Sequence, residues 1–133
     1  MSASLQPQKF PTRQFSRIAI KAKGRILFID PCNVVAVRAE GNYVSILPSE
    51  SGAHWLRESI SVMAEKLYHY GFVRINRSFL VNAAFVEEIR PWSTGEYVLR
   101  VKGGKEYTVT RTYRKNLKLL AESWIGTFGF VPG

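Results

Sequence analysis

Cysteine, long hydrophobic runs and secretion signals are scarce or missing in this sequence, and each absence excludes a class of protein. Of the 133 residues only Cys32 is a cysteine, so no disulfide can form within the chain. A single thiol fits a reducing compartment. No apolar run approaches the roughly 20 residues of a membrane-spanning helix, and the N-terminus has no signal-peptide core. We therefore expect an intracellular, cytoplasmic and soluble protein.

Motifs of catalysis and metal binding are also missing, because the chain has no P-loop, no nucleophile elbow and no metal-ligand spacing. Structural roles are expected for His54 and His69, and Cys32 is expected to be a small buried hydrophobe. Glu87 and Glu88 are neighbours in an expected strand. Their side chains should lie on opposite faces, which is poor geometry for joint acid–base work. We expect no enzyme, no metal and no cofactor.

Positive charge, in contrast, is abundant. The chain has 19 Lys and Arg against 10 Asp and Glu, a formal net charge of +9. This excess favours a polyanionic partner, nucleic acid first and an anionic membrane surface second, although a merely soluble basic protein has the same composition. The length predicts one domain at residues 16–125, between a polar arm or linker at 1–15 and a tail at 126–133.

Apolar residues alternate with period two over most of the chain, which predicts a mainly β domain. The first two strands should form a hairpin around Lys23 and Gly24, and Asp30 can cap one helical turn. Period alone does not decide between a sandwich, a barrel and a set of small sheets. The further expected strands are 35–40, 43–47, 53–57, 87–92, 96–101 and 105–109, and the stretch 71–82 is expected to be extended with an interruption at Arg77 and Ser78.

Two segments show helical spacing. The first, 59–70, has apolar residues at i, i+3, i+4 and i+7, Ser59 or Ser61 as its cap and Gly71 at its end. The second is expected over 111–124 with Thr110 as its cap. The expected apolar side of this second helix consists of Tyr113, Leu117, Leu120 and Trp124.

The stretch from Gly71 to Asn82, GFVRINRSFLVN, is the most informative part of the chain. Alternation predicts that Arg74 and Asn76 share one face of a strand and point outward with Arg77. A guanidinium held on a short stiff segment suits a phosphate or a guanine edge. The alternative is a surface arginine on a connection between strands.

The second helix has a basic side opposite its apolar side, and Arg111 falls in its first turn. A cation there is disfavoured by the helix dipole by up to about 1 kcal/mol, a conflict that a phosphate at the helix start would resolve. Earlier in the chain, Asn42 could read an adenine edge. Tyr43 could contact a partner or pack internally, and the basic side could be only a solvated face. The basic side consists of Arg111, Arg114, Lys115 and Lys118.

Four blocks in this order resemble the LytTR DNA-binding domain of bacterial transcription regulators, over about residues 18–124. They are IDPCNVVAVRAEGNYVSIL, ESISVMAEKL, FVRINRSFLVNAAFVEEI and KEYTVTRTYRKNLKLL. The resemblance implies an elongated arrangement of small antiparallel β-sheets with two short α-helices. It also implies that loop residues, not a recognition helix, enter successive major grooves of double-stranded DNA. This chain departs from the family pattern at Asn76, where histidine is usual, and at Thr110, where serine is common.

The resemblance assigns roles by position. Base contacts are implied for Asn42, Tyr43, Arg77, Arg111 and Thr112. Phosphate or supporting contacts are implied for Arg74, Asn76, Ser78, Arg114, Lys115 and Lys118. It further implies paired direct repeats bound by two copies. The polar arm is also consistent with the end of a linker to an upstream sensor or receiver domain absent from this chain.

Two other functions are consistent with the composition. A basic β module could dock on a partner protein or an anionic membrane, using Phe128 and Phe130 of the tail together with the basic helix. An RNA or single-strand binder would instead expose aromatic rings for stacking. Most aromatic residues lie in apolar runs here, which counts against that function.

Overall fold

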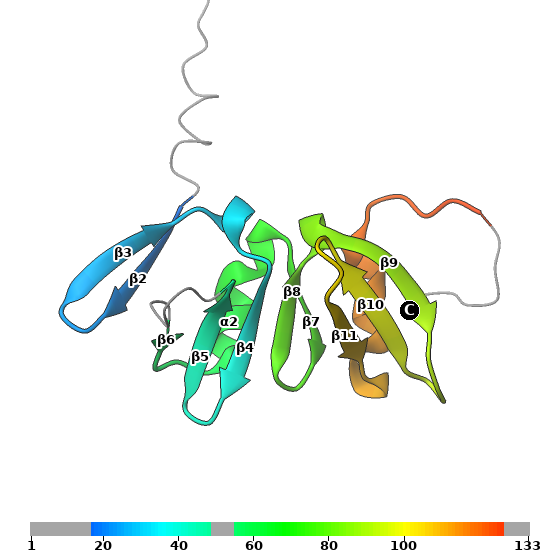
Figure 1. Ribbon diagram of the computed structural model, residues 1–133, viewed down its shortest axis with the longest axis horizontal. Coiled ribbons are helices and arrows are strands. Elements are labelled where there is room, and N and C mark those ends of the chain that lie inside the picture. The colour runs from blue at the N-terminus through cyan, green and yellow to red at the C-terminus, as the bar shows by residue number, and fades with distance from the viewer. Residues whose placement is uncertain (1–16, 49–54, 127–133) are drawn as a thin grey trace, which may run out of the picture. The chain divides into compact units, whose positions relative to one another are not determined.

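The computed structural model describes residues 17–48 and 55–126 (Figure 1). The chain divides into two compact units, residues 1–33 and 34–133. The described residues form ten strands in antiparallel sheets, together with short helices. The predicted mainly β fold is therefore confirmed.

The first unit contains a hairpin of β2 (Ile18–Ala22) and β3 (Arg25–Ile29). Its two-residue turn has positive φ at both Lys23 (52°) and Gly24 (77°), which matches the twist of the paired strands. A 3-10 turn η1 (Pro31–Asn33) follows, and Asp30 Oδ1 accepts a hydrogen bond from the Cys32 amide at 2.9 Å. The predicted capping is confirmed. The prediction of a buried Cys32 is wrong, because this turn leaves the residue exposed.

The second unit begins with a five-stranded sheet in the order β6-β5-β4-β8-β7. Its strands are β4 (Ala36–Glu40), β5 (Tyr43–Leu47), β6 (Trp55–Leu56), β7 (Phe72–Asn76) and β8 (Phe79–Asn82). Val37, Val44 and Leu80 are fully buried in it. The central strands therefore anchor the turns at their ends.

Helix α2 (Ile60–Leu67) packs against strands β4, β7 and β8. Its cap is Ser59, whose Oγ accepts a hydrogen bond from the Val62 amide at 3.1 Å. The α-helix ends earlier than predicted, because a 3-10 turn η2 (Tyr68–Tyr70) completes the segment. Gly71 follows with φ of 88°, the left-handed conformation expected at this position.

A three-stranded sheet follows in the order β11-β10-β9, with β9 (Val86–Pro91), β10 (Tyr97–Val101) and β11 (Glu106–Val109). The link into it is the 3-10 turn η3 (Ala83–Phe85), which the buried Asn82 caps. Asn82 Oδ1 accepts from the Ala84 amide at 3.0 Å, and Asn82 Nδ2 donates to the Val34 carbonyl at 2.9 Å. One side chain therefore fixes the passage between the two sheets.

The last helix, η4 (Arg111–Leu120), differs from its prediction in three respects. It has 3-10 geometry, it ends at Leu120, and Trp124 beyond it is exposed. Thr110 occupies the cap position without a side-chain hydrogen bond; instead, its carbonyl accepts from the Tyr113 amide at 2.9 Å. This i to i+3 hydrogen bond is the pattern of a 3-10 helix, which is wound more tightly than an α-helix. The apolar side of the helix is confirmed at Leu117, which is 1% exposed.

One buried cluster joins both sheets of the second unit to η4. It combines residues of β7, β8, β10, β11 and η4, so no element of the cluster can shift without disturbing the others. Its members are Ile75, Val81, Leu99, Val101, Val109 and Leu117.

Two leucines of η4 test this packing as a matched pair. Leu117→Ala should lower the free energy of unfolding by about 2–5 kcal/mol, because it leaves a cavity in the shared cluster. Leu119 is 44% exposed, so Leu119→Ala should cost less than about 1 kcal/mol. Urea denaturation of both variants measures the difference, and equal losses would contradict the role given to the cluster.

Candidate nucleic-acid interface

The predicted contact loops lie at one end of the second unit. The Ala39 amide donates to the Ser78 carbonyl at 2.8 Å, which places the β4–β5 turn beside the β7–β8 turn. The Thr110 amide donates to the Ile75 carbonyl at 3.0 Å, which places the start of η4 beside the end of β7. Figure 1 shows these turns, together with the β9–β10 turn, at the same end. We call this the loop end: residues 41–42, 77–78, 93–95 and 111–112.

The side chains at the tips of the loop end are open to solvent. Asn42, Arg77, Arg111 and Thr112 are all exposed. Tyr43 is 44% exposed, so it does not form part of the core. Within residues 17–48 and 55–126, no hydrogen bond or ion pair occupies the Asn42 or Arg77 side chain. These groups are therefore free to bind a partner.

Arg111 lies across Gly95 of the β9–β10 turn. A Cβ atom built on Gly95 would lie 2.9 Å from Arg111 Cγ and 3.0 Å from Nε. Gly95 also has φ of 73°, a backbone conformation that residues other than glycine rarely adopt. The bare backbone thus leaves room for the arginine stem. The sequence pattern marks Gly95 only as a turn residue, since its closeness to Arg111 depends on the fold.

A β-bulge separates Arg74 from Asn76. Arg74 pairs with Leu80 and Asn76 pairs with Phe79, so Ile75 is the extra residue. Leu80 and Phe79 are consecutive and face opposite ways, and so do their partners. The prediction that Arg74 and Asn76 share a face is therefore wrong, because the extra residue breaks the alternation.

Arg74 and Asn76 bond to different elements beside the β7–β8 turn. Arg74 Nη1 donates to Ser61 Oγ of α2 at 3.1 Å, and two other guanidinium nitrogens donate to backbone carbonyls. Asn76 Nδ2 donates to the Thr108 carbonyl of β11 at 2.9 Å, while Asn76 Oδ1 accepts from the Ser78 amide at 2.8 Å. Both side chains support the turn that carries Arg77.

Basic side chains on η4 extend the positive surface from the loop end. Arg114, Lys115 and Lys118 are exposed. Among the described residues, the arginines and lysines in ion pairs are Arg38, Arg90 and Arg100. The charges of η4 therefore have no carboxylate partner in that part of the chain, and they remain available for an anion.

The paired charges instead lie on the three-stranded sheet. Arg100 Nη1 lies 2.9 Å from Glu87 Oε1 and its Nε lies 3.5 Å from Glu88 Oε1. A register shift between Arg100 and Val101 brings both carboxylates to one side, so the prediction of opposite faces is wrong. On the same sheet, the hydrogen bond from Arg90 lowers the pKa of Glu106. This surface is close to charge-balanced and unlike η4.

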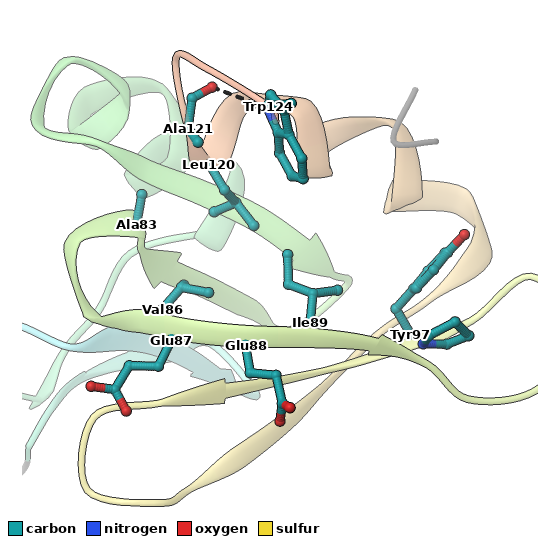
Figure 2. A pocket seen from close by; sticks show the side chains of 10 residues that line it. Ala83, Val86, Glu87, Glu88, Ile89, Tyr97, Leu120, Ala121 and Trp124 are labelled. Carbon is teal, nitrogen blue, oxygen red and sulfur yellow. Dashed lines mark hydrogen bonds between the residues drawn. The ribbon is translucent and has the colours of Figure 1, made fainter. Parts of the chain in front are cut away.

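An apolar groove of about 870 Å³ lies between β9 and the end of η4. Figure 2 shows Ile89, Leu120 and Trp124 around it, whereas Glu87 and Glu88 point away. No residue of the loop end lines this groove. It is therefore separate from the candidate interface.

The remaining predictions concern the histidines, the phenylalanines of the tail, metal binding and membrane spans. His69 is exposed in η2, whereas His54, Phe128 and Phe130 lie outside the described residues. Across the described ranges there is no group of three or more potential metal ligands from His, Cys, Asp and Glu. The described helices are also too short or too polar to cross a membrane.

The sheets and the exposed basic loop end define an antiparallel β domain of the nucleic-acid-binding class. The LytTr DNA-binding domain family model matches residues 24–122, about three quarters of the chain. The chain therefore belongs to the LytTR family of DNA-binding domains, which is not an enzyme family.

Individual relatives agree with this assignment. The sensory transduction protein LytT of Bacillus subtilis is 30% identical over 78% of this chain and 43% of its own length. LytT of Oceanobacillus iheyensis is 29% identical over 86% of this chain and 47% of its length. The chain thus spans less than half of these relatives. A solved LytTr DNA-binding domain from Bacillus cereus has the same fold, with a TM-score of 0.64 at 20% identity over 79% of this chain and 95% of that one.

Asn76 supports the loop end through hydrogen bonds, whereas Asn42 is only exposed on it, so substitutions of the two can be compared. Asn76→Ala removes hydrogen bonds to Thr108 and Ser78, and it should lower the free energy of unfolding by about 1–2 kcal/mol. Asn42→Ala should change it by no more than about 0.5 kcal/mol. Chemical denaturation gives both values. A neutral Asn76→Ala would show that its two hydrogen bonds do not stabilise the turn.

Proposed function

We propose that this domain binds a specific sequence of double-stranded DNA through its loop end, whose tips enter successive major grooves. The observation that carries the proposal is the pair of backbone hydrogen bonds, Ala39 to Ser78 and Thr110 to Ile75, that hold three tips at one end. One duplex can contact three tips only if they share an end. DNA binding by a transcription regulator agrees with the family.

Each tip offers chemistry that suits a base edge. The Arg77 guanidinium can donate two parallel hydrogen bonds to O6 and N7 of guanine, and the Asn42 amide can pair with N6 and N7 of adenine. Arg111 and Thr112 supply a third contact at the start of η4. Tyr43 adds an exposed aromatic ring beside Asn42, which suits apolar contact with a thymine methyl group.

Helix η4 is poorly suited to lie along a groove as a recognition helix. Leu117 and its neighbours hold one side of the helix in the core, and only its start reaches the loop end. We assign phosphate contacts to its exposed cations Arg114, Lys115 and Lys118. Such contacts fix the register of a protein on DNA without reading sequence. Ser78, exposed in the β7–β8 turn, can donate to a phosphate in the same way.

The relatives suggest the wider setting. They are sensory transduction proteins about twice as long as this chain. We propose that the chain is the cytoplasmic DNA-binding part of such a regulator, joined to an upstream sensor or receiver domain. Two copies would then occupy paired direct repeats. Selection of bound sites from a random duplex library would reveal the repeat and supply the cognate site for the measurements below.

The base-reading role of Arg77 predicts a selective loss. Arg77→Ala should weaken binding to the cognate duplex by about 1–3 kcal/mol and change binding to random duplex little. Arg77→Lys keeps the charge but loses the planar fork, so it should also lose discrimination. Fluorescence anisotropy with both duplexes measures the ratio. Equal losses on the two duplexes would refute base reading by Arg77.

The phosphate role of η4 predicts a uniform loss. Lys118→Ala should weaken cognate and random binding alike, and should reduce the slope of log affinity against log salt by about 0.9 for each phosphate that is no longer neutralised. Lys105, an exposed lysine of the β10–β11 turn at the opposite end of those strands, is the control. Lys105→Ala should leave the slope unchanged. A sequence-selective effect of Lys118→Ala would contradict its assignment.

A further inference from the structure

Arg74 is half-buried and its guanidinium is already committed within the protein. Arg74 Nη2 donates to the Arg77 carbonyl at 2.6 Å, Nε to the Asn76 carbonyl at 3.2 Å, and Nη1 to Ser61 Oγ at 3.1 Å. Its carbon Cζ also lies 5.3 Å from the centre of the Tyr113 ring. A phosphate contact would have to break several of these interactions.

The acceptors of these bonds lie in the turn that carries Arg77. A guanidinium has a rigid planar arrangement of donors, so bonds to the Asn76 and Arg77 carbonyls together restrict both peptide planes. The bulge directs Asn76 to the other face of β7, where it bonds to Thr108 and the Ser78 amide. The turn is therefore held from both sides of the strand.

Arg74 also connects this turn to the start of η4, which carries Arg111. Its own carbonyl accepts a hydrogen bond from Asn116 Nδ2 of η4 at 2.9 Å, and Tyr113 of η4 packs on its guanidinium. The carbonyl of the adjacent residue, Ile75, accepts a hydrogen bond from the Thr110 amide at the start of η4. The direction of Arg77 and the place of Arg111 are thus set by consecutive residues of β7.

We propose that Arg74 is a positioning residue for base recognition. It orients Arg77 and aligns the β7–β8 turn with the start of η4, and it increases discrimination between DNA sequences without contacting DNA. The inference rests on the proposed function, because it gives Arg74 a role through Arg77. A side chain such as Arg77, whose backbone is already held in the binding orientation, binds more tightly because it loses less conformational freedom on binding.

The decisive variant is Arg74→Lys, which keeps the charge but cannot reproduce the planar set of bonds. Affinity for the cognate duplex should fall about tenfold, the size of a typical coupling between contacting residues. Affinity for random duplex and the salt slope should not change. In an Arg77→Ala background the same substitution should have less than about a twofold effect, because its target is gone.

Two further measurements separate positioning from folding. Amide hydrogen exchange at Arg77 and Ser78 of the free protein should be faster in Arg74→Lys than in the parent, with global stability followed by urea denaturation. If Arg74→Lys does not fold, Ser61→Ala replaces it. This variant removes one acceptor on the surface of α2 and should cause a smaller loss of the same kind, on the cognate duplex alone.

Several outcomes would overturn the inference. A loss that is equal on all duplexes, together with a smaller salt slope for Arg74→Gln, would make Arg74 a phosphate contact. Losses that add fully with those of Arg77→Ala would show that Arg74 does not act through Arg77. An Arg77→Ala protein that discriminates between duplexes as well as the parent does would overturn the proposed role of Arg77 itself. Arg77→Ala alone therefore tests the proposed function, and Arg74→Lys tests the positioning role.

Discussion

The hydrogen bond from the Thr110 amide to the Ile75 carbonyl is the interaction on which the rest of the arrangement depends. It joins the strand at the edge of the five-stranded sheet to the segment that leaves the three-stranded sheet. Ile75 and Leu117 bury their side chains in the same cluster directly beside it. Because this packed core resists sliding, two turns and a helix start that are distant in sequence are held at one end.

Polar groups around this junction have two different roles. Arg74, Asn76 and Asn116 direct their donors to carbonyls and a hydroxyl of the protein, and this gives the loop end its shape. Arg77 and Asn42 carry no such bonds within the described residues and face solvent. A surface that reads DNA needs both kinds, since a free side chain discriminates between bases only when its backbone is held.

Short-range patterns predicted much of this protein. The hairpin at Lys23, a serine cap on α2 and the left-handed Gly71 follow from the preferences of a few adjacent residues, and all three are present. Of the two serines that could cap α2, Ser59 and Ser61, the structure uses Ser59. Longer-range features failed where one extra residue changed the register. The bulge at Ile75 and the register shift between Arg100 and Val101 each reversed a prediction about which side chains share a face. The end of η4 was also misplaced, since an apolar Trp124 extended the pattern without extending the helix.

The sequence by itself determined the mainly β class, the positions of nearly every strand, the excess of positive charge and the family resemblance. These depend on periodicity, composition and local motifs, which can be read along the chain. Only the tertiary structure decided which polar residues are free and which are bonded. The sequence pattern does not distinguish Arg74 from Arg77. In the structure Arg74 lies against α2 and η4, whereas Arg77 extends from the turn. That difference arises from strand pairing and packing between distant segments, which no local pattern encodes.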